Sequence, residues 1–212
     1  LNFEHHPENI IWSHRNYLLH FFPKFVERAT RLATVSNYSK KDIVSTYKVA
    51  PNQVDVVFNG ANDVFKPASE SVQNEFKNYH TSNCDFFIFI GTIHPRKNLD
   101  HLLLAFDEFK KRKENKVKLL IVGNKKWWPK ELEKTYQSMK FKKELIFMGR
   151  LTDEELSEAL ASALALTYLP YFEGFGIPIL EAFQAETAVI TSNVTSMPEV
   201  AKDAAILCDP RD

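Results

Sequence analysis

The sequence has few cysteines, no net charge and no long apolar run. Its two cysteines, Cys84 and Cys208, are too few for a disulfide framework or a CxxC metal site, so both are expected to be inert and partly buried. No apolar run approaches the roughly 20 residues of a membrane span. The 27 basic residues balance the 27 acidic ones. This balance argues against a nucleic-acid-binding protein, because such domains usually carry a basic excess.

One local basic run, at residues 110–113, ends an amphipathic segment, where cations complement the dipole of a helix end. We expect a solvated helix end there, not a nucleic-acid site. The chain begins at Leu1 without an initiator methionine or a signal-peptide pattern, so it is expected to be the interior of a longer protein. Its 212 residues suffice for one large domain or one and a half ordinary ones.

From residue 85 onward, short apolar runs alternate with longer amphipathic segments. Several short runs are apolar throughout, as expected for parallel strands covered on both faces. Between them, Leu99, Leu102, Leu103 and Phe106 recur at the spacing of one helix face. This alternation predicts an α/β fold, with a Rossmann-like parallel sheet of about six strands. The strands are predicted at residues 86–90, 118–122, 145–148, 164–169, 188–191 and 205–207.

The first sixty residues are organised differently and predict a partial second lobe. A helix is expected at residues 13–29, where Pro23 should kink or divide it. Strands are expected at residues 32–35 and 54–58. Between these strands, a capping-box-like sequence that begins at Ser39 predicts the start of another helix.

Breaks in regular structure at residues 59–60 and at Pro67 indicate a linker. We therefore divide the chain in two. Residues 1–66 are predicted to be the end of a preceding, truncated domain with its linker, and residues 67–212 a ligand-binding domain.

The segment from Glu173 to Glu181 carries the strongest functional signal. An apolar run ends before it, a Gly-Phe-Gly turn follows Glu173, and a helical pattern starts within it. Such a turn presents unpaired backbone N–H groups at the positive end of a helix dipole, which suits phosphate. A carboxylate in such a site can accept hydrogen bonds from sugar hydroxyls. The segment therefore predicts a phosphorylated sugar as ligand, although two acids at this spacing are common in ordinary helices.

Two cations, Arg96 and Lys97, follow the first predicted strand directly before a helix. Cations are unfavourable there against the helix dipole, which indicates an anionic ligand. Arginine can hold phosphate bidentately and lysine supplies a compact charge. Because parallel sheets bind ligands at the carboxyl ends of their strands, we expect these cations to converge with the turn at residues 174–177. The alternative is two solvated cations in a turn.

Other strand ends carry weaker signals. Trp127 and Trp128 could stack on a sugar or base, but packing on the sheet edge is favoured. Gly149 follows the third strand, where glycine lets a ligand approach the backbone closely. The sequence has no Asp-x-Asp cluster or His/Cys group, so neither a metal nor a cofactor is predicted.

Taken in order, these motifs resemble the donor domain of GT-B glycosyltransferases. The closer resemblance is to the large retaining "group 1" family that includes bacterial mannosyl- and glucosyltransferases. Residues 33–39 and 56–61 are similar to the segment that leads from the acceptor domain of this group to its donor domain. The motifs that carry the resemblance are Arg96-Lys97, Gly149, Glu173-Gly174-Phe175-Gly176 with Glu181, residues 196–201 and Asp209-Pro210.

The resemblance implies a role for each matching residue. Arg96 and Lys97 would stabilise the diphosphate as leaving group, Glu173 would contact the transferred sugar, and Glu181 the ribose. The donor-binding residues implied are Gly91 and Thr92 at the first strand end, Gly149, Arg150 and Leu151 beside the base, and Gly174, Phe175, Gly176 and Ile177 around the distal phosphate.

Two departures from the family pattern matter. Many relatives have Gly-Arg where this chain has Gly91-Thr92, so Arg96 is expected to replace the missing arginine. The active-site histidine of the family would fall just ahead of Leu1. His5 and His6 come too late for that role, and Pro7 beside them predicts an ordinary loop.

The resemblance implies an enzyme that moves a hexose from a nucleotide-diphosphate sugar to a glycan or lipid-linked acceptor, with retention, in cell-envelope polysaccharide synthesis. Such an enzyme would be cytoplasmic or at the inner face of the membrane, held there by the missing N-terminal domain, and this chain alone would be inactive. The alternatives are a GT-B nucleotide-sugar epimerase or sugar phosphorylase, and a non-catalytic sugar-nucleotide binding module.

Overall fold

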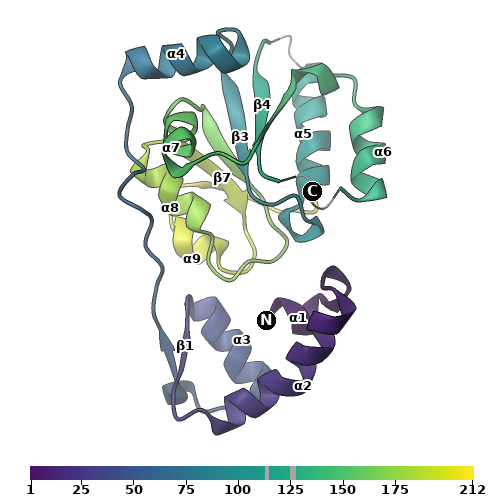
Figure 1. The fold of residues 1–212 in the computed structure, drawn as a ribbon, viewed down its shortest axis with the longest axis vertical. Helices are drawn as coiled ribbons and strands as arrows, with labels where there is room; N and C mark the ends of the chain where they lie inside the picture. Colours follow the sequence, from purple (N-terminus) through teal and green to yellow (C-terminus); the bar gives the residue numbers. More distant parts are fainter. Residues whose placement is uncertain (113–114, 125–127) are drawn as a thin grey trace.

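The computed structural model describes residues 1–112, 115–124 and 128–212, which form two lobes joined by an extended linker (Figure 1). The smaller lobe contains helices α1 (Asn2–His5), α2 (Trp12–Arg28) and α3 (Asn37–Tyr47) and strands β1 (Leu32–Thr34) and β2 (Val54–Val56). The larger lobe contains helices α4 (Glu70–Thr81), α5 (Leu99–Arg112), α6 (Lys130–Ser138), α7 (Asp153–Ala161), α8 (Ile177–Gln184) and α9 (Met197–Ala201). Its strands are β3 (Phe86–Ile90), β4 (Lys118–Val122), β5 (Leu145–Gly149), β6 (Ala165–Tyr168), β7 (Ala188–Ser192) and β8 (Ile206–Cys208).

The six strands of the larger lobe form one parallel sheet in the order β5-β4-β3-β6-β7-β8. The predicted fold class is confirmed, and each predicted strand agrees with an observed one to within one residue at either end. Since all strands are parallel, the loops that follow them lie at one edge of the sheet. This edge brings the predicted site residues within reach of one another.

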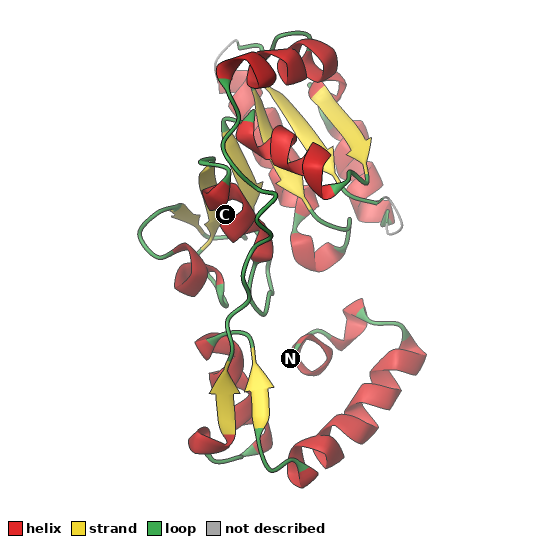
Figure 2. Cartoon of the chain, turned by 60° about the vertical axis from the view of Figure 1, so that its left-hand side comes forward, coloured by secondary structure: helices red, strands yellow, loops and turns green. Residues whose placement is uncertain are grey.

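Helices cover both faces of this sheet (Figure 2). On one face, α4, α7, α8 and α9 enclose a core that includes Phe86, Leu120 and Leu166, all fully buried. On the other face, α5 and α6 pack over a second core around Phe89 and Leu119. Strands buried on both sides require side chains that are apolar in both directions, which explains why their sequences do not alternate.

The smaller lobe holds a parallel pair, β1 and β2, in which Leu32 lies opposite Val54. Helix α2 continues through Pro23, so of the two predicted effects, a kink or a division, the division does not occur. Helix α3 begins at Asn37, so its cap lies three residues before Ser39, where the predicted capping box begins. The N-cap is Ser36, because its extended backbone leaves the side chain free to accept a hydrogen bond from the Ser39 N–H.

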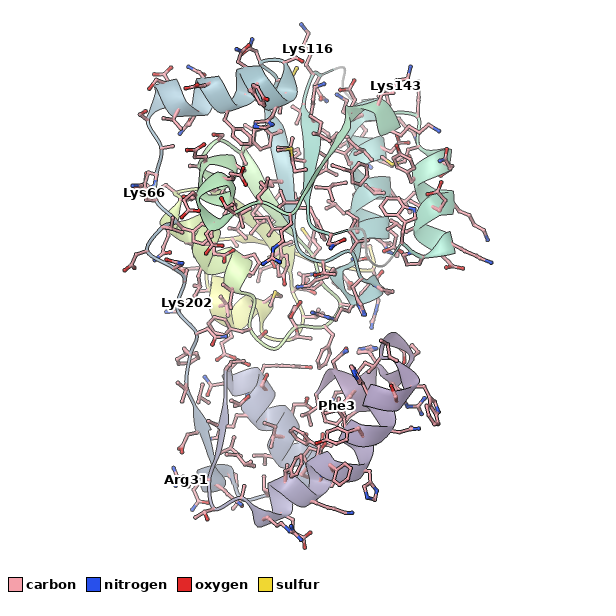
Figure 3. All side chains as sticks on the ribbon, in the orientation of Figure 1. Phe3, Arg31, Lys66, Lys116, Lys143 and Lys202 are labelled. Carbon is pink, nitrogen blue, oxygen red and sulfur yellow. The ribbon has the colours of Figure 1, made fainter. Side chains whose placement is uncertain are left out.

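The linker that follows β2 runs along the larger lobe. Figure 3 shows Lys66 on this linker and Lys202 at the end of α9, whereas Phe3 and Arg31 lie in the smaller lobe. Ser157 on α7 fixes the linker, since its hydroxyl donates to the Val64 carbonyl at 3.0 Å and accepts from the Lys66 N–H at 3.3 Å.

Two further expectations need correction. The segment around His5 and Pro7 is not an ordinary loop but forms α1 and a short 3-10 helix (Pro7–Asn9). The basic end of α5 is not fully solvated, because the Lys110 ammonium is buried and donates to the Asn115 and Val117 carbonyls. These bonds satisfy acceptors beyond the helix end; Lys113 lies outside the described residues.

Cys84 and Cys208 are half-buried and unpaired, as expected. Within the described ranges, none of the helices combines the length and apolarity that crossing a lipid bilayer requires.

Candidate functional site

Arg96, Lys97 and Glu173 meet at the carboxyl edge of the sheet. Arg96 and Lys97 occupy a 3-10 turn (Pro95–Lys97) after β3, and Glu173 lies in the loop after β6, the neighbouring strand. The Arg96 guanidinium and the Lys97 ammonium both form ion pairs with Glu173 Oε1. The predicted convergence is confirmed, although a direct contact between the two cations and Glu173 was not expected.

Tyr168, the last residue of β6, completes this cluster. Its hydroxyl accepts a hydrogen bond from Lys97 Nζ at 2.6 Å and donates one to Glu173 Oε1 at 3.0 Å. The side chain is only 1% exposed, and Lys97 Nζ lies 4.8 Å from the centre of its ring. Tyr168 was not predicted as a site residue; the signal was a tyrosine hydroxyl at the carboxyl end of a strand, where ligands bind.

Burial and charge act against each other in this cluster. Burial disfavours the ionised carboxylate of Glu173, but the charges of Lys97 and Arg96 outweigh it and lower the pKa of Glu173. Burial also lowers the pKa of Lys97, and the negative charge of Glu173 offsets this lowering only in part. Burial, followed by the Glu173 charge, raises the pKa of Tyr168 and keeps it neutral. Two cations therefore face one carboxylate, and the excess positive charge suits an anion.

The turn after Glu173 presents unpaired donors. Gly176, with φ +104°, is the N-cap of α8, and Pro178 follows in the first turn. Among the described residues, no acceptor pairs with the backbone N–H of Phe175, Gly176 or Ile177. Their direction at a helix start is the arrangement that binds phosphate.

Gly176 also leaves no room for a side chain. A Cβ atom there would lie 2.7 Å from Met197 Cε, and its backbone conformation is one that L-residues rarely adopt. Only glycine therefore fits this turn without displacing Met197.

Glu181 lies one turn into α8 and is half-buried. Within the described part of the chain its carboxyl forms no hydrogen bond or ion pair. Burial and, second, the charge of Asp153 raise the pKa of Glu181 to about 7. Asp153 opens α7 just beyond Leu151, and α7 packs against α8, the helix that carries Glu181. A half-buried carboxyl without a partner can accept hydrogen bonds from a ligand.

The remaining predicted residues line the same edge. Gly91 adjoins Lys97, since a Cβ at Gly91 would lie 3.6 Å from Lys97 Cε. Thr92 and Arg150 are exposed, and Leu151 packs against the core. Gly149, with φ +70°, ends β5 and would have open space around a Cβ. Strand β4 separates β3 from β5, so the strands that end at Gly91 and Gly149 lie about 10 Å apart.

Gly123 lies between them and brings two strand ends together. A Cβ there would meet the Gly91 carbonyl oxygen at 1.9 Å, so only glycine permits this approach of the two loops. Trp128 packs edge-on against Tyr136 and Phe147, which supports packing over ligand stacking; Trp127 lies outside the described residues.

Two histidines of the smaller lobe lie closer to this edge than the sequence indicated. The rings of His5 and His6 contact Phe172, the residue before Glu173, with centroids 5.7 and 5.3 Å away. His5 Nε2 also lies 2.6 Å from Asp42 Oδ1. Across the described ranges, no group of three or more His, Cys, Asp or Glu side chains could hold a metal ion.

A family model described as "Glycosyl transferases group 1" matches residues 71–212. The chain belongs to this family. This group 1 glycosyl transferase is 27% identical over 210 residues to the O-antigen chain mannosyltransferase B of Escherichia coli. The matched region covers 99% of this chain and 54% of that protein. It is 28% identical over 187 residues to the O-antigen chain mannosyltransferase RfbU of Salmonella typhimurium, covering 88% and 49%. The chain thus spans about half the length of these relatives.

Solved structures show the same fold for this group 1 glycosyl transferase. Anabaena HepE in complex with UDP and glucose matches with a TM-score of 0.80 at 16% identity, over 96% of this chain and 55% of that one. WaaG, a glycosyltransferase involved in lipopolysaccharide biosynthesis, matches with a TM-score of 0.73 at 18% identity, over 94% and 59%. These likenesses confirm the predicted GT-B fold class.

Proposed function

We propose that this chain is the nucleotide-sugar-binding part of a glycosyltransferase that moves a hexose from a nucleoside-diphosphate sugar to a glycan or lipid-linked acceptor. Residues 67–212 would form the donor domain and residues 1–66 the end of the acceptor domain. The mannosyltransferase names of two relatives favour mannose as the hexose. Their O-antigen function favours a role in cell-envelope polysaccharide synthesis.

One observation carries the proposal. A cluster with an excess positive charge, Arg96 and Lys97 around Glu173, lies directly before a turn whose backbone N–H groups are unpaired. Cations and helix-start N–H groups together are suited to a diphosphate. The half-buried Glu181 lies on α8, the helix that this turn opens, so its carboxyl is available for the nucleoside that follows the diphosphate.

The proposed transfer breaks the bond between C1 of the sugar and the diphosphate oxygen, which leaves with the electron pair. A bond forms between C1 and an acceptor hydroxyl, whose proton is released. Negative charge grows on the diphosphate, so Arg96, Lys97 and the N–H groups of Phe175 and Gly176 would stabilise the transition state more than the ground state. Glu173 would accept hydrogen bonds from the transferred sugar and Glu181 from the ribose.

Retention of configuration is inferred from the resemblance of the motif set alone. The proposal requires no cofactor or metal. It places the enzyme in the cytoplasm or at the inner face of the membrane, where nucleotide sugars would be the donors.

The test is incubation of the complete protein with GDP-mannose, UDP-glucose and ADP-glucose, followed by NMR of the products. We expect transfer, or slow donor hydrolysis in the absence of an acceptor, with one donor strongly preferred. The anomeric configuration of the product reports retention or inversion. Arg96→Gln should abolish turnover, whereas Arg31→Gln, which removes an exposed cation of the smaller lobe, should leave it unchanged.

Other outcomes distinguish the alternatives. Epimerisation at C2 of the donor sugar would indicate a GT-B epimerase, and phosphate-dependent cleavage of a glycan a phosphorylase. Binding of a donor without turnover under all conditions would indicate a non-catalytic sugar-nucleotide module. Each of these results would reject the transferase proposal.

A further inference from the structure

Three consecutive carbonyl groups of the phosphate turn accept hydrogen bonds from serine hydroxyls. Ser196 shares its one hydroxyl proton between the carbonyl of Glu173 at 3.0 Å and that of Phe175 at 3.2 Å. The carbonyl of Gly174 accepts from Ser36 at 2.7 Å and from Ser39 at 3.2 Å. Ser36 and Ser196 are fully buried, so these bonds are shielded from water.

Peptide geometry links these bonds to the opposite side of the turn. In a trans peptide, the C=O of one residue and the N–H of the next point in opposite directions. Holding the Gly174 carbonyl therefore directs the Phe175 N–H, and holding the Phe175 carbonyl directs the Gly176 N–H. These are the N–H groups to which no described residue provides an acceptor.

The serines come from both lobes. Ser196 precedes α9 of the larger lobe, whereas Ser36 and Ser39 lie at the start of α3 in the smaller lobe. Glu199 fixes this helix start against α9, since its carboxylate accepts from the N–H of Asn37 at 2.8 Å and of Tyr38 at 3.0 Å. Burial opposes ionisation of Glu199, but these backbone bonds prevail and lower its pKa.

We propose that Ser36, Ser39 and Ser196 are positioning residues that orient the N–H groups of the phosphate turn, and that the smaller lobe thereby controls affinity for the distal phosphate. The proposal rests on the donor site proposed above and adds the residues that set its geometry. All three serine hydroxyls are bonded to carbonyl groups of the turn. Each acts through the carbonyl that it holds, so contact between the lobes and binding of a diphosphate favour one another.

The test compares a nucleoside diphosphate with its monophosphate, because only the diphosphate has a distal phosphate. GDP, GMP, UDP and UMP are titrated calorimetrically into the complete protein and into Ser39→Ala, which leaves the Ser36 cap of α3 intact. Loss of one neutral hydrogen bond should weaken diphosphate binding about three- to tenfold. Monophosphate binding should not change, and Ser39→Thr, which keeps the hydroxyl, should restore diphosphate binding.

Ser45→Ala is the matched control. Ser45 lies on the same helix, and its hydroxyl donates within that helix to the Asp42 carbonyl at 3.0 Å. Two results would overturn the proposal. One is that Ser39→Ala and Ser45→Ala bind the diphosphate equally well. The other is that Ser39→Ala loses the same affinity for the monophosphate as for the diphosphate. If none of GDP, UDP and ADP binds the unmodified protein, the proposed donor site itself is rejected.

Discussion

The hydroxyl of Tyr168 joins Lys97 to Glu173 by accepting from one and donating to the other. The distances are 2.6 Å to Lys97 Nζ and 3.0 Å to Glu173 Oε1. Because the tyrosine is rigidly buried in β6, it fixes both charged groups relative to the sheet. In the proposed donor site, Lys97 and Glu173 are therefore held in position by a side chain of the protein core.

Tyr168→Phe should reduce kcat/KM for the donor about tenfold, because Lys97 and Glu173 each lose a partner that holds them in place. Donor kinetics of the complete protein, together with thermal unfolding, provide the measurement. Tyr47→Phe is the control, since the Tyr47 hydroxyl also donates to a carboxylate, Glu4 Oε1 at 2.5 Å, but in the smaller lobe. Equal kinetics in the two variants would show that Tyr168 has no positioning role.

Glu173→Gln should lower kcat about ten- to a hundredfold, because the proposed hydrogen bonds to the transferred sugar lose a charged acceptor. Affinity for the free nucleoside diphosphate should rise about two- to tenfold, since Arg96 and Lys97 no longer pair with a carboxylate. Calorimetry and steady-state kinetics separate the two effects. Glu108→Gln neutralises an exposed acid on α5 and should change neither. A loss of diphosphate affinity in Glu173→Gln would show that Glu173 belongs to the nucleotide end.

Nucleotide binding should release a proton from Glu181. The pKa of this carboxyl is about 7 because burial disfavours its charge. Ribose hydroxyls donate more strongly to the ionised form, so binding lowers that pKa and releases about half a proton per nucleotide at pH 7. Affinity should therefore increase by about tenfold from pH 6 to pH 8 and change little above that.

The measurement is calorimetric titration in buffers of different ionisation enthalpy. Glu181→Gln should abolish this proton release and weaken binding at pH 8 more than at pH 6. Any titration of the nucleotide itself persists in the variant and is subtracted. An identical pH dependence in both proteins would remove Glu181 from the ribose site.

Much of the larger lobe could be predicted because its strands carry an unambiguous local pattern. A run such as Phe86–Ile90 is apolar throughout, short, and made of aromatic and β-branched residues, which favours a buried strand over a helix. Helix α4 was not predicted because its sequence is mostly polar, and only Phe76 and Thr81 are buried. The start of α3 was predicted too late because Ser36 and Ser39 are both plausible caps, and only the backbone at Ser36 decides between them.

Part of the candidate site could likewise be predicted from the sequence, and part could not. Arg96, Lys97 and Glu173 could be predicted to converge because strand ends share one edge of a parallel sheet. The pairing of the cations with Glu173 depends on the order of the strands, which local patterns do not determine. Ser36 was not predicted because 138 residues separate it from Gly174, and the contact exists only where the two lobes meet.

The most direct test of the donor site is the affinity of UDP, GDP and ADP for the protein in which Arg96 and Lys97 are both changed to glutamine. If these cations hold the diphosphate, the preferred nucleotide should bind the double variant at least about a hundredfold more weakly, since two charged hydrogen-bond donors are lost. The control, Arg31→Gln with Lys77→Gln, removes the same net charge from two ion pairs elsewhere, with Asp55 and Asp85, and should bind as the unmodified protein does. Unchanged affinity in the Arg96 and Lys97 double variant would contradict the account.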